Sequence, residues 1–104
     1  MATLNEIRGA LTGITINRAK ALVGLASTDK EYPDTGDIRI ATNFSAVQLG
    51  GMGSALTKIL INGQPLITTR PIKTDRNTSQ YVWNSQVATK RQILQVLKEF
   101  GIKI

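Results

Sequence analysis

The chain of 104 residues contains no histidine and no cysteine. Histidine supplies most general bases near neutral pH, cysteine supplies many nucleophiles, and both are common zinc and copper ligands. Their absence excludes the catalytic dyads and metal centres that are built on either residue, and without cysteine no disulfide framework exists. We therefore expect a non-enzymatic protein with no catalytic residues, no cofactor and no bound metal.

Aromatic residues and long apolar runs are also scarce. Only 5% of the residues are aromatic, so the core is expected to be aliphatic. The chain has no apolar run near the roughly 20 residues that span a bilayer, and its first residues do not resemble a secretory signal. The sequence thus predicts a single soluble domain over residues 1–104, located in the cytoplasm and without a membrane partner.

Positive charge is in excess and unevenly placed. The chain has 13 basic and 7 acidic residues, a formal net charge of +6. Four acids fall within residues 29–37, whereas the segment from Ile38 to the end contains nine basic and two acidic residues. This asymmetry favours a polyanionic partner, and a solvated basic surface is the alternative.

Two helices are predicted near the N-terminus. Thr3 and Glu6 have the spacing of a capping box, and apolar residues then recur every three or four positions, which predicts a helix over 3–12. The next segment alternates like a strand at 14–16 but has helical spacing further on. We favour a helix over 17–26.

The last part of the chain carries the clearest helical pattern. Apolar residues including Leu97 recur with helical spacing over 86–100. Asn84 or Ser85 is the expected N-cap, and Gly101 suits the left-handed position that follows a helix.

An acidic segment over 29–37 is predicted to be a loop, because it combines four acids with Pro33 and Gly36. It does not match a calcium-binding loop, which needs glycine at the sixth position and glutamate at the twelfth. Counted from Asp29, those positions are Asp34 and Ile40.

The segment after this loop resembles a strand that leads into a connector. Residues 38–42 alternate between apolar and polar, and the strand is expected to resume over 46–49. The glycine-dense stretch 50–54 lacks the lysine of a phosphate-binding P-loop and the third glycine of a dinucleotide fingerprint. We interpret it as a flexible connector.

Asn62-Gly63 is the strongest local signal. This pair is the preferred type I′ turn of a β-hairpin, and it predicts strands over 56–70 that place Pro65 opposite Leu60. The alternative is a helix over 54–61 that ends at Gly63.

These elements together predict an α+β fold. An N-terminal helical segment is followed by an antiparallel sheet of three to five strands across 38–83, which includes the Asn-Gly hairpin and a short strand over 81–83. The amphipathic helix over 86–100 is expected to pack on the sheet.

Nucleic-acid binding through phosphates, with little sequence specificity and no choice between DNA and RNA, is the function that this pattern favours. Tyr81 and Trp83 are two residues apart on a strand, so both rings are expected to share a face on which bases stack. Alternatively, Trp83 anchors the core. The complete set of predicted nucleic-acid-binding residues is Lys58, Arg70, Lys73, Arg76, Lys90, Arg91, Tyr81 and Trp83.

A structural or interaction protein is the alternative function. The chain is rich in small polar residues, and Pro65 marks an edge strand. Such a chain suits a subunit of a larger assembly, for example a virion component or an accessory protein of a molecular machine. Its partners are then copies of itself or other protein subunits.

Overall fold

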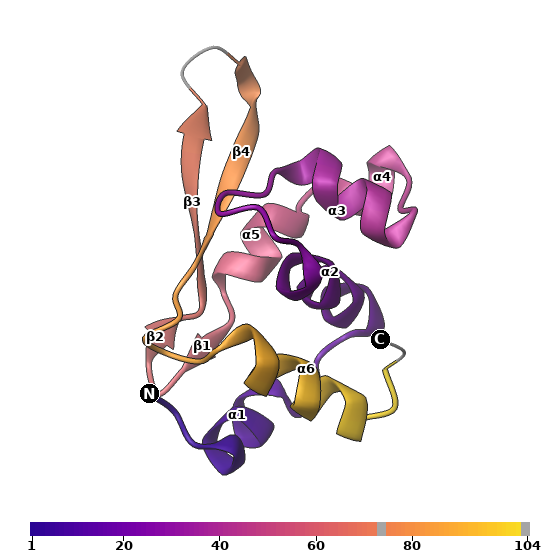
Figure 1. The fold of residues 1–104 in the computed structure, drawn as a ribbon. Helices are drawn as coiled ribbons and strands as arrows, with labels where there is room; N and C mark the ends of the chain where they lie inside the picture. The colour runs from indigo at the N-terminus through magenta and orange to yellow at the C-terminus, as the bar shows by residue number, and fades with distance from the viewer. Residues whose placement is uncertain (73–74, 103–104) are drawn as a thin grey trace.

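A computed structural model describes the backbone of residues 1–72 and 75–102, with side chains described outside 71–79. The molecule has an α+β fold, as the sequence predicts, with helices beside and below a long β-hairpin (Figure 1). The predicted single sheet of three to five strands is wrong, because the described strands form two separate two-stranded sheets. In chain order, the described elements are α1 (Leu4–Leu11), α2 (Ile16–Ser27), α3 (Thr35–Thr42), α4 (Ala46–Leu49), α5 (Met52–Thr57), β1 (Leu60–Ile61), β2 (Gln64–Pro65), β3 (Ile67–Ile72), β4 (Asp75–Trp83) and α6 (Lys90–Glu99).

The two N-terminal helices confirm the sequence prediction. The Thr3 side chain accepts a hydrogen bond from the Glu6 backbone N–H, and the Glu6 carboxylate accepts one from the Thr3 N–H, so the capping box is complete. At α2, the Thr15 hydroxyl accepts a hydrogen bond from the Arg18 N–H. A local cap thus fixes where each helix begins.

For the C-terminal helix, the structure confirms the predicted end and corrects the predicted start. It begins at Lys90, because Thr89 and Gln92 form the capping box instead of Asn84 or Ser85. It ends at Glu99, and Gly101 adopts the left-handed conformation predicted for the position after the helix, with a φ of 85°. The Ile102 N–H then donates to the Leu97 carbonyl, and this contact closes the last turn.

The predicted strand over 38–42 is wrong, because this segment forms α3. Asp34 and Asp37 each accept a hydrogen bond from the backbone N–H of the other, an acidic version of the capping box. The predicted loop therefore ends at Asp34. Ile38 is buried while Ile40 is 85% exposed, so their alternation reflects opposite sides of a short helix.

The predicted strand over 46–49 is also wrong. Ser45 and Gln48 form another capping box, which starts the short helix α4. In the predicted connector, Gly51 adopts a φ of 81°, and α5 begins one residue later. Glycine is needed there because other residues are strained in the left-handed region.

The Asn-Gly turn is confirmed, but its strands are short. Asn62 and Gly63 have φ values of 54° and 76°, and Leu60 pairs with Pro65 as predicted. The hairpin does not extend over 56–70, because residues 56–57 belong to α5 and residues 67–70 belong to β3, which pairs with β4 instead. The competing helix prediction over 54–61 is correct as far as Thr57 and wrong beyond it.

A second hairpin, formed by β3 and β4, extends away from the helices (Figure 1). Its antiparallel register pairs Ile67 with Trp83 and Thr69 with Tyr81. The short strand predicted over 81–83 is the end of β4. The rest of the hairpin is polar and threonine-rich, and the sequence pattern did not reveal it as a long pair of strands.

The hydrophobic core lies between the helices and the near end of this hairpin. Helix α6 packs against α1 and α2, and its buried side chains share one apolar cluster with Leu66 and Ile67. Helices α2 and α3 pack closely, since a Cβ added to Gly24 would lie 3.0 Å from the Ala41 Cβ. In the part of the chain that the structure describes, no helix has the length and apolar character needed to cross a bilayer.

Candidate functional site

The β3–β4 hairpin, hereafter the arm, has two distinct faces. Ile67 and Tyr81 are buried on its inner face, against the helices, whereas Thr68 and Arg70 are exposed on its outer face. Successive side chains of a strand point to opposite sides, so this division follows from the register. The outer face is available for contact with a partner.

Tyr81 and Trp83 share a face, as predicted, but it is the inner one. Tyr81 is only 3% exposed. Trp83 is half-buried, and its indole N–H donates to the Ala88 carbonyl at 2.9 Å. The predicted surface for base stacking is therefore wrong for these two rings, which join the arm to the core instead.

The loop between α2 and α3 makes backbone contacts with the edge of β4 that does not pair with β3. The Tyr81 N–H donates to the Pro33 carbonyl at 2.7 Å, and Asp34 forms an isolated bridge with Gln80. Part of the acidic loop thus acts as a short third strand beside β4. This contact holds the near half of the arm against the helices.

Arg70 packs against the same loop through its side chain. Its guanidinium carbon lies 4.3 Å from the centre of the Tyr32 ring. Both residues are at the surface. A guanidinium stacked on a ring keeps its in-plane N–H groups available as donors, and such groups bind phosphate or carboxylate.

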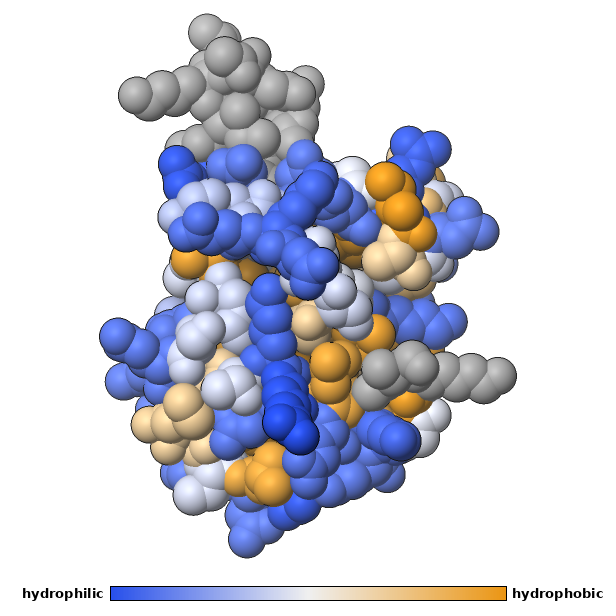
Figure 2. Space-filling model, in the orientation of Figure 1, coloured by the Kyte–Doolittle hydropathy of each residue, from blue (hydrophilic) through white to orange (hydrophobic). Residues whose placement is uncertain are grey.

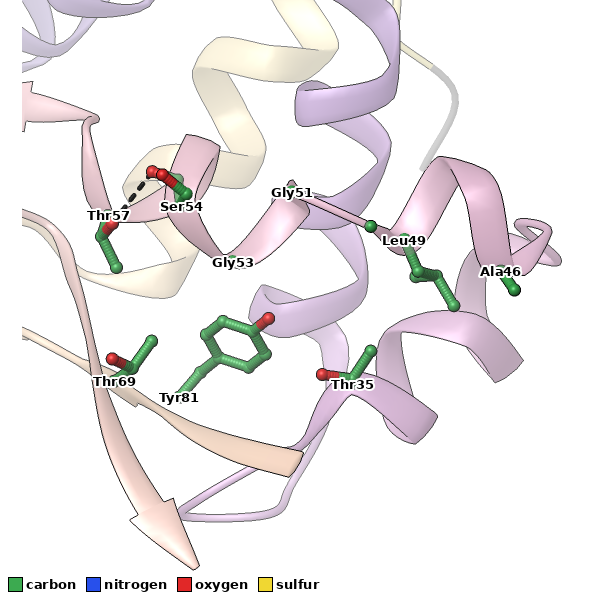
Figure 3. Close-up of a pocket in the computed structure, with 10 residues that line it drawn as sticks. Thr35, Ala46, Leu49, Gly51, Gly53, Ser54, Thr57, Thr69 and Tyr81 are labelled. Atoms are coloured by element: carbon green, nitrogen blue, oxygen red, sulfur yellow. Dashed lines mark hydrogen bonds between the residues drawn. The ribbon is translucent and has the colours of Figure 1, made fainter. Parts of the chain in front are cut away.

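A groove of about 730 Å³ lies between the inner face of the arm and the helices α3, α4 and α5. Figure 3 shows the Tyr81 ring extending beneath α5, with Thr69 beside it on β3 and Thr35 at the start of α3. None of the described residues that line the groove is charged. Its hydroxyl-bearing lining residues are Thr35, Ser54, Thr57, Thr69 and Tyr81.

The structure distributes the other predicted basic residues over several surfaces. Lys58 lines a separate hollow together with Arg18, at the turn between α1 and α2. Arg91 is exposed on α6. The Lys90 ammonium donates to the Thr28 carbonyl at 3.2 Å, so it is engaged at the end of α2. Among the described residues, Lys58, Lys90 and Arg91 therefore do not form one basic cluster with Arg70.

The two remaining predicted residues belong to the far half of the arm. Lys73 lies outside the described residues. Arg76 falls within β4, but its side chain is among those that the structure does not describe. For Lys73 and Arg76 we therefore use only the formal positive charges that the sequence gives to the far half of the arm.

Among the described residues, ion pairs occur at two places, both among the helices. Arg8 binds Glu99 with an N–O distance of 2.6 Å, and Lys30 binds Asp37 at 2.7 Å. The Arg8 guanidinium lowers the pKa of the Glu99 carboxyl below its ordinary value of 4.5. These pairs neutralise charge away from the arm.

No family model, curated protein or solved structure matches this chain. The chain is therefore characterised by what its own fold and surfaces define: a helical body with a basic, two-stranded arm and, at the base of that arm, a groove whose described lining residues are uncharged. The sequence pattern did not reveal the groove, because its lining residues come from α3, α4, α5, β3 and β4 and form no motif. The contact between Arg70 and Tyr32 was missed for the same reason.

Proposed function

We propose that this protein is a non-catalytic domain that binds nucleic acid through phosphate contacts made by its arm, with little sequence specificity. The observation that carries the proposal is the exposed arm with Arg70 on its outer face (Figure 1). A two-stranded ribbon is narrow enough to lie in a nucleic-acid groove or along a single strand.

The charge of the arm supports this proposal. Residues 67–83 contain three basic residues and one acidic residue. Arg70 is held by the Tyr32 ring, so less side-chain entropy is lost when its guanidinium binds a phosphate. Phosphate contacts provide affinity without reading the base sequence, which accounts for the low specificity that we propose.

A salt series of binding to a short labelled oligonucleotide tests the proposal. The logarithm of the binding constant should fall linearly with the logarithm of salt concentration, by roughly 0.7 to 0.9 per phosphate contact. Arg70→Gln should reduce this slope by about one contact. Arg91→Gln removes the same charge from α6 and is the matched control, for which we expect an unchanged slope. Absence of binding even at low salt would refute the function.

A second candidate function, assembly with other protein subunits, is favoured by one observation. Ile40 on α3 and Val47 on α4 are 85% and 88% exposed. In Figure 2, apolar residues are visible on the otherwise mainly hydrophilic surface over α3 and α4. Sedimentation at increasing concentration tests this candidate. An oligomer that Ile40→Asp dissociates would support assembly, and a monomer at every concentration would exclude self-assembly.

A further inference from the structure

We propose that the groove at the base of the arm receives an unpaired nucleobase, so that the protein prefers single strands to duplexes. This inference rests on the proposed nucleic-acid function and specifies its substrate class. The groove has a volume of about 730 Å³, within the range of pockets that hold small organic groups.

The lining of the groove suits a neutral, polar ligand. Its described residues carry hydroxyl groups and no charge. A hydroxyl both donates and accepts hydrogen bonds, so it can pair with the amide, amine and ring-nitrogen groups on the edge of any base. A phosphate would be unfavourable here, because none of the lining residues that the structure describes carries a positive charge to replace its hydration.

Flat and open surfaces complete the groove. Leu49 from α4 supplies an apolar side chain, whereas Tyr81, which is almost fully buried, borders the groove with only a small part of its surface (Figure 3). Gly51 and Gly53 leave the backbone of this wall uncovered. A Cβ added to Gly53 would lie 3.1 Å from the Tyr81 hydroxyl oxygen, so glycine at this position lets the Tyr81 ring pack closely against α5.

The position of the groove relative to the arm points to a nucleotide in particular. Thr69 lines the groove, and Arg70 is the next residue of β3, on the opposite face of the same narrow ribbon. Because Arg70 faces the opposite side of the ribbon, a phosphate bound there would belong to a neighbouring nucleotide of the same strand, while the groove receives a neutral base. In a duplex the base edges are paired and stacked, so only an unpaired base can enter without cost.

The first test compares a labelled single strand with the same strand annealed to its complement. We expect wild-type protein to bind the single strand roughly tenfold more tightly, the effect of one accommodated base. Thr69→Val removes a groove hydroxyl at nearly constant volume and should reduce this preference. Thr68→Val makes the same change on the outer face and should leave the preference unchanged.

A second pair of variants changes the space in the groove without changing charge. Gly53→Ala pushes a methyl group toward the Tyr81 hydroxyl and should weaken single-strand binding more than duplex binding. Gly9→Ala introduces the same methyl group in α1, where no atom lies within 4 Å of the new Cβ. It should bind like the wild type. Circular dichroism of each variant shows whether the fold is retained.

Titration with thymidine 5′-monophosphate locates the base directly. The amide resonances of Gly51, Gly53 and Thr69 should shift, whereas inorganic phosphate should leave them in place. Equal affinity for single strand and duplex, with salt-dependent binding retained, would overturn this inference and leave the proposed function standing. Loss of all oligonucleotide binding at low salt would refute both. Shifts confined to Gly9 and Gly13 would place the nucleotide elsewhere and also overturn the inference.

Discussion

The helical body and the arm are built in opposite ways. In the body, α1, α2 and α6 each bury aliphatic side chains in one core, and capping boxes at Thr3 and Thr89 define where α1 and α6 begin. The arm is one hairpin whose near end joins this core through Ile67, Tyr81 and Trp83. Its outer face exposes Thr68 and Arg70.

This difference separates stability from binding. Burial of apolar area is the main source of folding free energy, so substitutions in the body should change stability strongly. Exposed residues of the arm contribute little to folding and are free to serve a partner. This division would be wrong if variants of the body and variants of the arm changed folding stability and nucleic-acid binding to the same extent.

The largest expected effect is in the body. Leu97 is fully buried on α6, and Leu97→Ala should lower the free energy of unfolding by about 2–5 kcal/mol, measured by urea denaturation. Leu60, which is 52% exposed on β1, is the matched control. Leu60→Ala should have a much smaller effect. An unchanged midpoint for Leu97→Ala would contradict the packing of α6.

The next effect concerns the turn that links body and arm. Gly63 has a φ of 76°, where a Cβ costs about 1–2 kcal/mol, so Gly63→Ala should destabilise the protein. Gly9→Ala lies inside α1 and should stabilise it by about 0.5–1 kcal/mol. Thermal unfolding of both variants should therefore give shifts of opposite sign. Shifts of the same sign would be inconsistent with a left-handed Gly63.

A smaller effect is expected at the start of α6. Thr89→Ala removes the hydroxyl that accepts a hydrogen bond from the Gln92 N–H, at a cost of about 1 kcal/mol. Thr89→Ser retains the hydroxyl and should recover most of the lost stability. Equal stability of the alanine and serine variants would show that the cap does not hold this helix.

The smallest expected effect is a loss of folding stability in acid, because protonation of Glu99 removes its ion pair with Arg8. The hydrogen bond from Arg8 lowers the pKa of Glu99 below 4.5 in the folded state. A carboxyl of this kind stabilises the fold above the unfolded pKa, and that contribution is lost as pH falls through the folded pKa. Stability should therefore decline below about pH 4.5. Glu99→Gln should flatten this decline, and an identical pH profile would exclude the pair as a contributor.

Local signals explain which parts of the fold the sequence predicts well. The cap at Thr3 and the turn at Asn62-Gly63 depend on residues a few positions apart, and both occur as expected. The segment 38–42 misled the prediction, because a helix with one buried side and a strand show similar alternation over five residues. Asp34 and Asp37 held the deciding signal, a capping box in which both members are acidic.

The candidate site was less predictable because it depends on tertiary packing. The spacing of Tyr81 and Trp83 correctly indicates a shared face, but only the position of the helices decides whether that face is buried. In the same way, Arg70 meets Tyr32 across 38 positions of sequence. Net charge favours the prediction of a polyanionic partner, and the fold was needed to propose a surface that would bind it.

The most direct test of the division between body and arm is a salt series with two triple variants. The first changes Arg70, Lys73 and Arg76 to glutamine on the arm, and the second changes Lys20, Arg91 and Lys98 to glutamine on the body. Both lose the same charge, so nonspecific attraction falls equally. We predict that the arm variant loses about three phosphate contacts from the slope, with an unchanged urea midpoint, and that the body variant retains the wild-type slope. Equal slopes for the two variants, or a larger loss in the body variant, would contradict binding through the arm.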